Sequence, residues 1–411
     1  MTATALQQEE HLPEAIVCKW CGKSFHYLKS HISMGRCENI PESAKGLDVD
    51  EVVKMYTSAF PDEPTISRTA LAKLNEKRAE KHSGEGKVAE ISAHPSYAGT
   101  VEYKTELVAA HELLGVTIKE LGTPRGKPLQ VTVNVNTPYP EFVPEAKKNY
   151  VYGDFDLIKD IFMMLEIGIP GYLWGHAGTG KSSLPTQLCA LLNRPLIRAQ
   201  HTASMEEAHV TGQILARDGS TYFEPGLLAL AMKNGWVYLA DEYDFAFPQI
   251  LGVYQPVLEG EPLIIKEATP DWRRITPHKR FAFIGTGNTN GSGDETGLYQ
   301  GTNIQNAANF SRFGIVSNVK YMSTKAEVNM LAEAGVIREY AEKMVKFANL
   351  VREGYEQHLI SQPIGPRELL LSAKIGMMRG DFSAGIEKSF INKLPSTSAQ
   401  AAREVVQKIF G

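Results

Sequence analysis

The sequence predicts an α/β protein built on a five-stranded parallel sheet, with a C-terminal group of helices and a small N-terminal metal-binding module. Three observations carry this prediction. Apolar runs alternate with helical patterns through the middle of the chain, a glycine-rich motif follows one of these runs, and three of the four cysteines lie within residues 18–37. Such alternation is typical of parallel sheets that are covered by helices on both faces.

Five apolar runs bounded by turn residues predict the strands of the sheet. Helical patterns separate most of them, and after the last run the pattern is helical to residue 411, which predicts a helical lid. The runs are residues 168–175, 195–200, 236–242, 281–288 and 315–322.

The domain organisation expected from these patterns has five parts. Within the third part, residues 69–87 predict a solvated helix, residues 105–121 a helix and residues 128–135 a strand. The parts are a disordered leader (1–15), a zinc finger (16–40), a connecting region with a small ordered patch (41–137), an α/β core (138–322) and the lid (323–411).

Composition excludes several classes of protein. The chain has 411 residues, and 43 basic against 47 acidic side chains give a net charge of −4, which disfavours non-specific nucleic-acid binding by the whole chain. No apolar run reaches the ~18 residues of a membrane span. The N-terminal residues do not have the pattern of a secretory signal, so we expect a cytoplasmic protein.

The strongest motif is GHAGTGKS, residues 175–182, which fits G-x-x-x-x-G-K-[ST] between a predicted strand and a predicted helix. Glycines let backbone amides surround phosphate oxygens, and the helix N-terminus adds a positive dipole end. We expect Lys181 to reach the β- and γ-phosphates of ATP and Ser182 to bind Mg²⁺. The expected nucleotide-binding residues are Gly175, His176, Ala177, Gly178, Thr179, Gly180, Lys181, Ser182 and Ser183.

An acidic pair ends a later strand. Residues 236–244 read WVYLADEYD, so Asp241 and Glu242 come at the carboxyl end of a buried strand, where open α/β sheets bind ligands. Asp241 is expected to hold Mg²⁺ and to belong to the nucleotide site. Glu242 is expected to orient and activate the attacking water. A base beside the metal carboxylate indicates hydrolysis.

Three further polar residues follow in order. Asn288 ends the next predicted strand, where it can hydrogen-bond the γ-phosphate or the attacking water. Arg312 precedes the last strand, and Arg367 opens a helix of the lid. Phosphoryl transfer builds negative charge, which a guanidinium compensates.

This order of motifs resembles the AAA+ ATPases. The resemblance implies that Asn288 is sensor 1, that Arg312 is the arginine finger reaching the neighbouring subunit's nucleotide, and that Arg367 is sensor 2. Because the finger acts in trans, it also implies a homo-oligomeric ring, usually of six subunits.

Finer features resemble the MoxR and magnesium-chelatase branch, and within it the small ATPase subunits of aerobic cobaltochelatases (CobS-like). Residues 222–244, 241–260 and 285–316 carry this likeness, which extends over about residues 138–320, and SGDETGLYQGT (292–302) is its most specific part. Ser311 departs from the family, where an aspartate is expected before the finger.

The resemblance also implies an inserted hairpin that faces the centre of the ring. Residues 214–226 match its place, and the preceding loop, residues 202–213, is a second candidate. The alternative for both segments is an ordinary surface loop.

The N-terminal cysteines read C-x2-C-x9-H-x5-C. Three thiolates and one imidazole suit a tetrahedral structural Zn²⁺, and so short a segment hardly forms a core without metal. Phe25 and Leu28 have the spacing of a miniature core, and the pattern resembles the Ros-type prokaryotic zinc fingers. His26 is the rival ligand. The expected ligands are Cys18, Cys21, His31 and Cys37.

The target of the finger stays open at this point. Its positive residues suit nucleic acid, its aromatic residues suit a protein contact, and a purely structural role is the third alternative. One finger reads only about three base pairs, so any DNA specificity would be weak. The positive residues are Lys19, Lys23, Lys29 and Arg36.

We therefore expect an ATP-hydrolysing ring ATPase that remodels or activates a partner protein. The resemblance implies a partner with a von Willebrand-type metal-binding domain. One alternative is the ATPase subunit of a cobaltochelatase in cobalamin synthesis. The other is a nucleic-acid-associated motor with the finger as its DNA contact.

Overall fold

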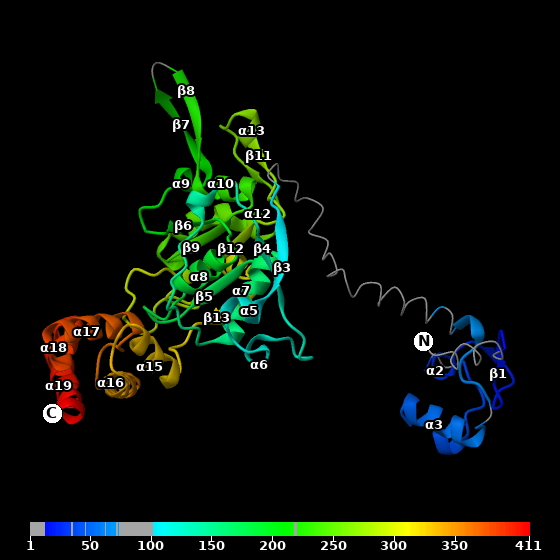
Figure 1. Cartoon of the computed structure of the whole chain (residues 1–411). Coiled ribbons are helices and arrows are strands. Elements are labelled where there is room, and N and C mark those ends of the chain that lie inside the picture. Colours follow the sequence, from blue (N-terminus) through cyan, green and yellow to red (C-terminus); the bar gives the residue numbers. More distant parts are fainter. Residues whose placement is uncertain are drawn as a thin grey trace. The chain divides into compact units, whose positions relative to one another are not determined.

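The structure is a computed structural model, and it describes residues 13–33, 36–45, 47–61, 63–70, 73, 102–217 and 220–411. The chain divides into two compact units, residues 1–91 and 92–411 (Figure 1). Most of the expected leader (1–15) and of the charged helix expected at residues 69–87 lies outside the described residues.

The N-terminal unit has one small hydrophobic core shared by the finger and a following helix. Cys18, Phe25 and Leu28 of the finger pack with Val52 and Tyr56 of that helix. Asp48 caps the helix N-terminus by accepting from the backbone of Asp50. The elements are β1 (Ile16–Val17), β2 (Ser24–Phe25), α2 (Leu28–Ser33), η1 (Glu42–Ala44) and α3 (Val49–Ala59), and β1 pairs antiparallel with β2.

The segment expected as a connecting region, residues 41–137, is divided between the two units. Its first part belongs to the finger, because Val52 and Tyr56 of α3 pack in the small core and Ile66 forms a β-bridge with Tyr27. Its last part belongs to the C-terminal unit, because Val131 and Leu121 pack in the same hydrophobic cluster as Ile161 of the core.

The helix expected over residues 105–121 is wrong in its first third. Residues 105–109 form strand β3 (Thr105–Ala109), which pairs antiparallel with β4 (Gln130–Asn134). A partner strand about twenty-five residues further along the chain decides this, and the local pattern does not reveal it. The helical part is also broken, because Gly115 ends α5 (Ala110–Leu114) in a left-handed conformation before α6 (Ile118–Leu121).

The centre of the C-terminal unit is the predicted five-stranded parallel sheet. Its strand order is β13-β5-β12-β9-β6, and every neighbouring pair is parallel. The strands are β5 (Gly171–Trp174), β6 (Leu196–Gln200), β9 (Val237–Asp241), β12 (Ala282–Gly287) and β13 (Ile315–Asn318).

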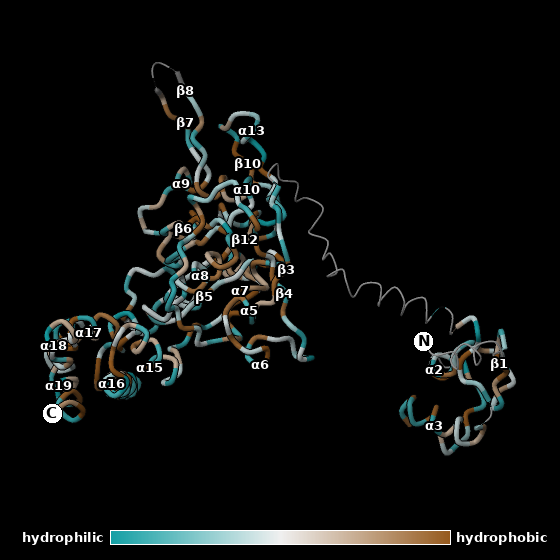
Figure 2. The backbone as a smooth tube through the Cα atoms, in the orientation of Figure 1, coloured by the Kyte–Doolittle hydropathy of each residue, from teal (hydrophilic) through white to brown (hydrophobic). Residues whose placement is uncertain are grey.

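Alternate residues of β9 belong to two different cores. Val237 and Leu239 pack with helix α7 (Phe155–Ile167) and helix α8 (Ser183–Leu191), whereas Tyr238 and Ala240 pack in the cluster of α10 (Leu227–Asn234) and α12 (Gln255–Leu258). Figure 2 shows the hydrophobic residues gathered in the sheet and in α7. β9 is therefore covered on both faces, as its apolar run predicts.

Two antiparallel hairpins interrupt the α/β core. β7 (Gly212–Arg217) and β8 (Ser220–Pro225) form the hairpin expected at residues 214–226, which extends away from the sheet in Figure 1. β10 (Leu263–Ile264) and β11 (Arg274–Ile275) form a second, which the sequence reading missed. The remaining elements are η2 (Pro140–Phe142), α9 (Glu207–Thr211), η3 (Tyr243–Phe245), α11 (Pro248–Leu251), η4 (Gly252–Tyr254), α13 (Pro270–Arg273) and α14 (Ala307–Phe310).

The C-terminal helices form the predicted lid around a hydrophobic cluster of their own. A buried ion pair adds to it, because both guanidinium NH groups of Arg352 donate to the fully buried Glu327. No helix among the described residues is long and apolar enough to cross a membrane. The lid elements are α15 (Thr324–Glu333), α16 (Arg338–Glu356), α17 (Pro366–Arg379), α18 (Phe382–Ser389), η5 (Ile391–Lys393) and α19 (Ser396–Phe410).

Candidate active site

The glycine-rich motif forms a loop between β5 and α8. β5 ends at Trp174 and α8 begins at Ser183, so the loop leads into a helix N-terminus. Gly178 and Gly180 have φ values of 80° and 103°, which residues with side chains rarely adopt. The sequence therefore needs glycine at both positions to turn the backbone towards a ligand.

The P-loop lysine is buried and folded back on its own loop. Only 7% of Lys181 is exposed, and its Nζ donates to the carbonyl oxygens of Gly175 (2.7 Å) and His176 (2.9 Å) and to Oδ1 of Asn288 (3.1 Å). Burial lowers the pKa of Lys181 to about 8, although the nearby Glu242 carboxylate opposes this shift. The ammonium group is therefore held by groups that a phosphate can replace.

Asp241 ends β9 and contacts the first residue after the P-loop lysine. Its Oδ1 accepts from the hydroxyls of Ser182 and Thr286, and its Oδ2 accepts from Nε of Arg198 at 2.6 Å. Burial opposes ionisation of Asp241, but these hydrogen bonds and the guanidinium outweigh it and lower the pKa. Hydroxyl and carboxylate oxygens are Mg²⁺ ligands, so Ser182 and Asp241 fit the expected metal.

Glu242 has a strained backbone directly after the strand. Its φ of 55° is one of three positive values at non-glycine residues in the part of the chain that the structure describes. Such strain concentrates at functional sites. Its Oε2 accepts from Nδ2 of Asn288 at 2.8 Å, and burial raises its pKa. Asn288 thus bridges Glu242 and Lys181.

Asp244, which the sequence reading missed, positions this asparagine. It is fully buried, and its Oδ2 accepts from the backbone amides of Asn288 (2.8 Å) and Thr289 (2.9 Å) and from the Thr289 hydroxyl (3.0 Å). The signal available in the sequence was a further acidic residue three positions after Asp241. Arg198 was also missed, because an arginine within an apolar strand gives no sign of which carboxylate it contacts.

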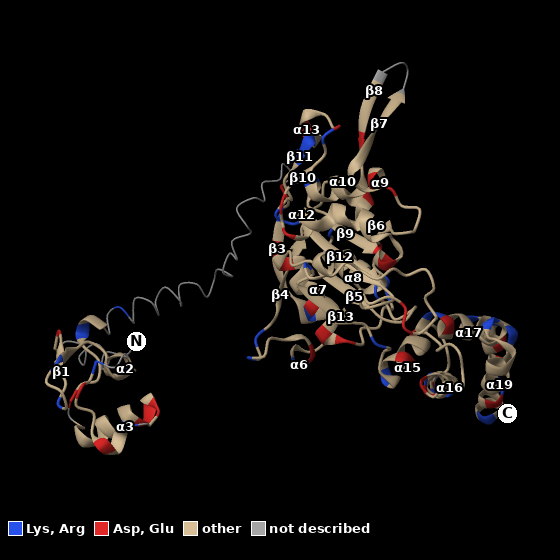
Figure 3. Cartoon of the chain, turned by 180° about the vertical axis from the view of Figure 1, so that it is seen from behind, with Lys and Arg blue, Asp and Glu red and all other residues tan. Residues whose placement is uncertain are grey.

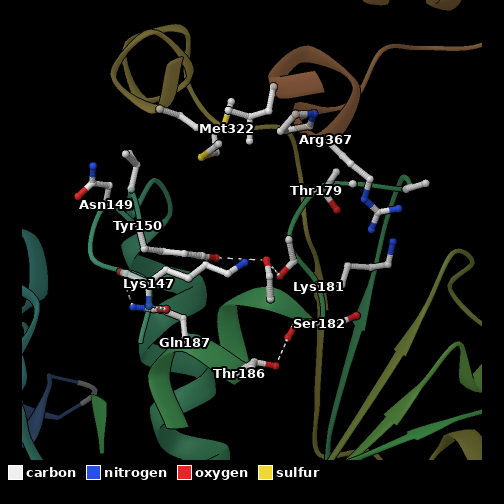
Figure 4. Close-up of a pocket in the computed structure, with 18 of the residues that line it drawn as sticks. Lys147, Asn149, Tyr150, Thr179, Lys181, Ser182, Thr186, Gln187, Met322 and Arg367 are labelled. Atoms are coloured by element: carbon white, nitrogen blue, oxygen red, sulfur yellow. Dashed lines mark hydrogen bonds between the residues drawn. The ribbon is translucent and has the colours of Figure 1, made fainter. Parts of the chain in front are cut away.

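A pocket of about 590 Å³ lies between the P-loop and the lid (Figure 4). The P-loop residues 177–183 line one side, with Glu242 and Arg198 near them. Arg367, at the start of α17, lines the lid side, where Figure 4 places it opposite Lys147 and Tyr150. Gly175 and His176 line a neighbouring cavity of about 210 Å³ together with Asn288.

Arg312 lies outside this pocket, just after the short helix α14. Its Nε donates to Oε1 of Glu259 at 2.7 Å, and its NH1 donates to the carbonyl oxygen of Ala308. The structure therefore brings together all predicted residues of the nucleotide site except this arginine.

The N-terminal cysteines and His31 converge on a separate site. The ligand atoms of Cys18, Cys21, His31 and Cys37 all lie within 4.8 Å of one another. The Sγ atoms of Cys18 and Cys37 are 3.7 Å apart, far beyond a disulfide and close to the ~3.8 Å edge of a tetrahedral zinc–thiolate site. The cluster thus fits structural zinc.

His26, the rival ligand, points elsewhere. Its Nδ1 lies 3.1 Å from the Ser67 hydroxyl and 3.2 Å from that of Thr69. These contacts hold the segment after α3 against the finger. His26 therefore belongs to the packing of the N-terminal unit and lies outside the Cys₃His cluster.

Three lysines of the finger pair with acidic residues of the same unit. Lys19 contacts Glu63 at 2.8 Å and Lys29 contacts Asp50 at 2.5 Å, and the third pair joins Lys23 to Glu38. Figure 3 shows acidic residues on α3. The positive surface expected from the finger sequence is therefore largely neutralised within the unit, which disfavours nucleic acid as its target.

The sheet, the P-loop and the acidic strand end define a P-loop nucleotide-binding protein. Comparison with known proteins agrees with this geometry. The model of the AAA domain (dynein-related subfamily) matches residues 172–302. The aerobic cobaltochelatase subunit CobS of a Sinorhizobium species is 32% identical over 249 residues, which cover 58% of this chain and 74% of that protein. The chain belongs to the AAA+ ATPases, in the branch related to CobS.

Two further similarities are more distant. An uncharacterized protein of Staphylococcus aureus strain NCTC 8325 is 23% identical over 265 residues, covering 62% of this chain and 96% of that protein. The Thermotoga maritima RuvB Holliday junction branch migration motor has 13% identity and a TM-score of 0.38, covering 64% of this chain and 72% of that chain.

Proposed function

We propose that this AAA+ ATPase hydrolyses ATP to ADP and phosphate at the pocket between the P-loop and the lid. The observation that supports this best is the convergence of Lys181, Asp241 and Glu242 on one edge of the sheet, with Asn288 joining the lysine to the glutamate. These are a phosphate-binding cation, a metal ligand and a base, which phosphoryl transfer to water needs.

Each residue then has a separate task. The P-loop amides and Lys181 bind the phosphates of ATP, and Ser182 and Asp241 hold Mg²⁺. When bound, Mg²⁺ neutralises charge on the β- and γ-phosphates. Glu242 accepts the proton of the attacking water, and Asn288 orients it. Although burial raises the pKa of Glu242, the nearby Lys181 charge favours its ionised form.

We also propose that Arg312 acts on the nucleotide of a neighbouring subunit in a homo-oligomeric ring, by analogy a hexamer. Its position outside the pocket of its own chain supports a role in trans. Arg367, which lines the pocket of its own chain, supplies positive charge from the lid.

The work done by this cycle is proposed to be remodelling of a partner protein, with a von Willebrand-type metal-binding domain as the candidate. The hairpin β7–β8 is suited to contact it, because Ile214 and Tyr222 expose about half and two fifths of their surfaces (53% and 40%). Exposed apolar side chains on an extended hairpin are typical of protein contacts.

The likeness to CobS favours a second candidate, the ATPase subunit of a cobaltochelatase. The zinc-binding finger is proposed to dock a protein in either case, because its lysines are paired within the N-terminal unit. A motor that uses the finger as a DNA contact is the alternative that this pairing disfavours. A cytoplasmic location stays a prediction.

The test of hydrolysis is Glu242→Gln. We expect the variant to bind ATP with an affinity close to that of the wild type and to lose turnover by at least about 10²-fold, because the water loses its base. Glu339→Gln, which alters an exposed carboxylate on α16, is the matched control and should turn over normally. Undiminished hydrolysis by Glu242→Gln would show that Glu242 is not the base.

The test of the shared site mixes two inactive variants. Arg312→Ala lacks the proposed finger, and Lys181→Ala lacks the phosphate cation. In a mixed ring an intact pocket can face an intact finger, so the mixture should regain part of the activity. Rings that stay inactive at every mixing ratio would count against action in trans.

A further inference from the structure

Three tyrosines from three different segments surround His176 of the P-loop. Nδ1 of His176 lies 2.9 Å from the hydroxyl of Tyr299, in the loop between β12 and α14. Its ring stacks on Tyr321, between β13 and α15, with centroids 5.7 Å apart and planes 2° apart. Tyr355, near the end of α16, meets the same ring edge to face at 5.7 Å and 88°.

Tyr299 is held in place by the loop 292–302, for which the ATPase site has no other use. Oδ2 of Asp294 accepts from the backbone amide of Tyr299 at 2.7 Å, and Oδ1 accepts from the amides of Thr296 and Gly297. The Tyr299 hydroxyl accepts from the backbone amide of Ala177 at 3.1 Å. Through Tyr299 this loop therefore contacts two consecutive residues of the P-loop, His176 and Ala177.

Tyr321 connects the same histidine to the lid. The guanidinium of Arg352 lies 4.0 Å from the centroid of the Tyr321 ring, which is a cation–π contact. Arg352 also donates to Glu327 of α15 and, through Nε, to the carbonyl oxygen of Ile364 at 3.0 Å. One arginine thus joins α15, α16 and the turn before α17 to the tyrosine that covers His176.

The turn before α17 touches the P-loop directly. A side chain at Gly365 would place its Cβ 2.8 Å from the carbonyl oxygen of Ala177, and one at Gly178 would lie 3.4 Å from Cβ of Arg367. The lid therefore meets the P-loop at this turn and at the His176 ring. Arg352 ties both contacts together.

Lys181 connects the contacts of His176 to nucleotide binding. Its Nζ is bonded to the carbonyl oxygens of Gly175 and His176, and a phosphate oxygen that takes over the ammonium group weakens those bonds. The backbone of His176 then loses a partner at the residue whose ring is enclosed by the three tyrosines. Occupancy of the pocket thus acts on the residue that contacts the lid.

We propose that His176 with Tyr299, Tyr321 and Tyr355 forms a joint that couples nucleotide occupancy of the P-loop to the position of the lid, and so of Arg367. The inference rests on the proposed function of the pocket. His176 and Tyr321 are positioning residues in this scheme, because they act through Arg352 and the turn before α17.

The experiment measures amide hydrogen exchange of residues 360–370 with and without ADP. In the wild type we expect ADP to slow exchange there by about tenfold, within the usual range of coupling between sites. In Tyr321→Leu, ADP should still bind, with an affinity within about threefold of the wild type, but the slowing should be lost. Tyr321→Phe keeps the ring face and should retain it.

Tyr340→Leu is the matched control, because Tyr340 stacks on Phe382 within the lid, with centroids 4.8 Å apart. It should keep the slowing by ADP. The inference is overturned if Tyr321→Leu and His176→Ala respond to ADP like the wild type, or if Tyr340→Leu loses the response equally, which would indicate general loosening of the lid. Wild-type protein that fails to bind ADP would overturn the proposed nucleotide site itself.

Discussion

The two units of the chain place their polar groups by opposite means. In the C-terminal unit a sheet buried on both faces sets the positions of Asp241, Glu242 and Asn288, and any ligand arrives at a site that already exists. In the N-terminal unit the strands have two residues each, and the Cys₃His cluster lies inside the only core that the described part of that unit has. In that unit two of the metal ligands, Cys18 and Cys37, are part of the hydrophobic core, so the metal site and the fold depend on each other.

Removal of zinc should give the largest difference between the two units, because it should unfold only one of them. We expect Cys21→Ser, or a chelator applied to the full chain, to unfold the described part of the N-terminal unit, because structural zinc contributes on the order of 10 kcal/mol to so small a fold. ADP binding by the C-terminal unit should stay unchanged. Hydrogen exchange measured with and without ADP checks both statements, and metal analysis measures the loss of zinc. Cys189→Ser, outside the cluster, should retain zinc. A zinc-free chain with a protected N-terminal unit would contradict the prediction.

Loss of the buried Asp244 should be the next largest effect. Asp244→Ala leaves the amides of Asn288 and Thr289 and the Thr289 hydroxyl without their acceptor, which costs about 2–4 kcal/mol of unfolding free energy. Turnover should fall further than ADP affinity, because Asn288 loses its support beside Glu242. Denaturant unfolding and steady-state kinetics measure the two effects. Equal losses in turnover and affinity would mean that Asp244 serves stability alone.

The site residues that belong to sequence motifs were predicted, and the site residues whose roles depend on tertiary contacts were missed. The P-loop, Asp241, Glu242 and Asn288 follow from motif spacing and from the parallel order of strands. Asp244 and Arg198 were missed because their roles depend on which groups lie next to them in space.

The same distinction holds for the fold. The five strands were visible because each belongs to an apolar run bounded by turn residues, and β9 and β12 are buried along their whole length. The strand β3 was not, since its pairing with β4 is non-local. The packing of α3 on the finger was also hidden, because Val52 and Tyr56 have the spacing of any amphipathic helix.

Proton uptake on nucleotide binding should be a smaller effect, specific to the C-terminal unit. Burial lowers the pKa of Lys181 to about 8, so at pH 8 roughly half of the molecules have a neutral lysine. Phosphate binding favours the charged form of the lysine. When ADP binds, Lys181 should therefore take up about half a proton at pH 8 and almost none at pH 6.5. Calorimetry in buffers of different ionisation enthalpy measures this uptake. Lys181→Arg, which stays protonated, should abolish it, and uptake that persists would assign the proton to another group.

The smallest expected effect concerns the paired surface of the N-terminal unit. Asp50→Asn frees Lys29 from its partner, and one unpaired lysine should raise the affinity of the full chain for duplex DNA by at most about fivefold at 0.15 M salt. Fluorescence anisotropy with a labelled duplex measures this, with Asp381→Asn in the lid as the control. Because its lysines are already neutralised, the wild-type finger should bind DNA only weakly. Tight, salt-resistant binding by the wild type would show that its surface is built for nucleic acid, and protein docking would then give way to the motor alternative.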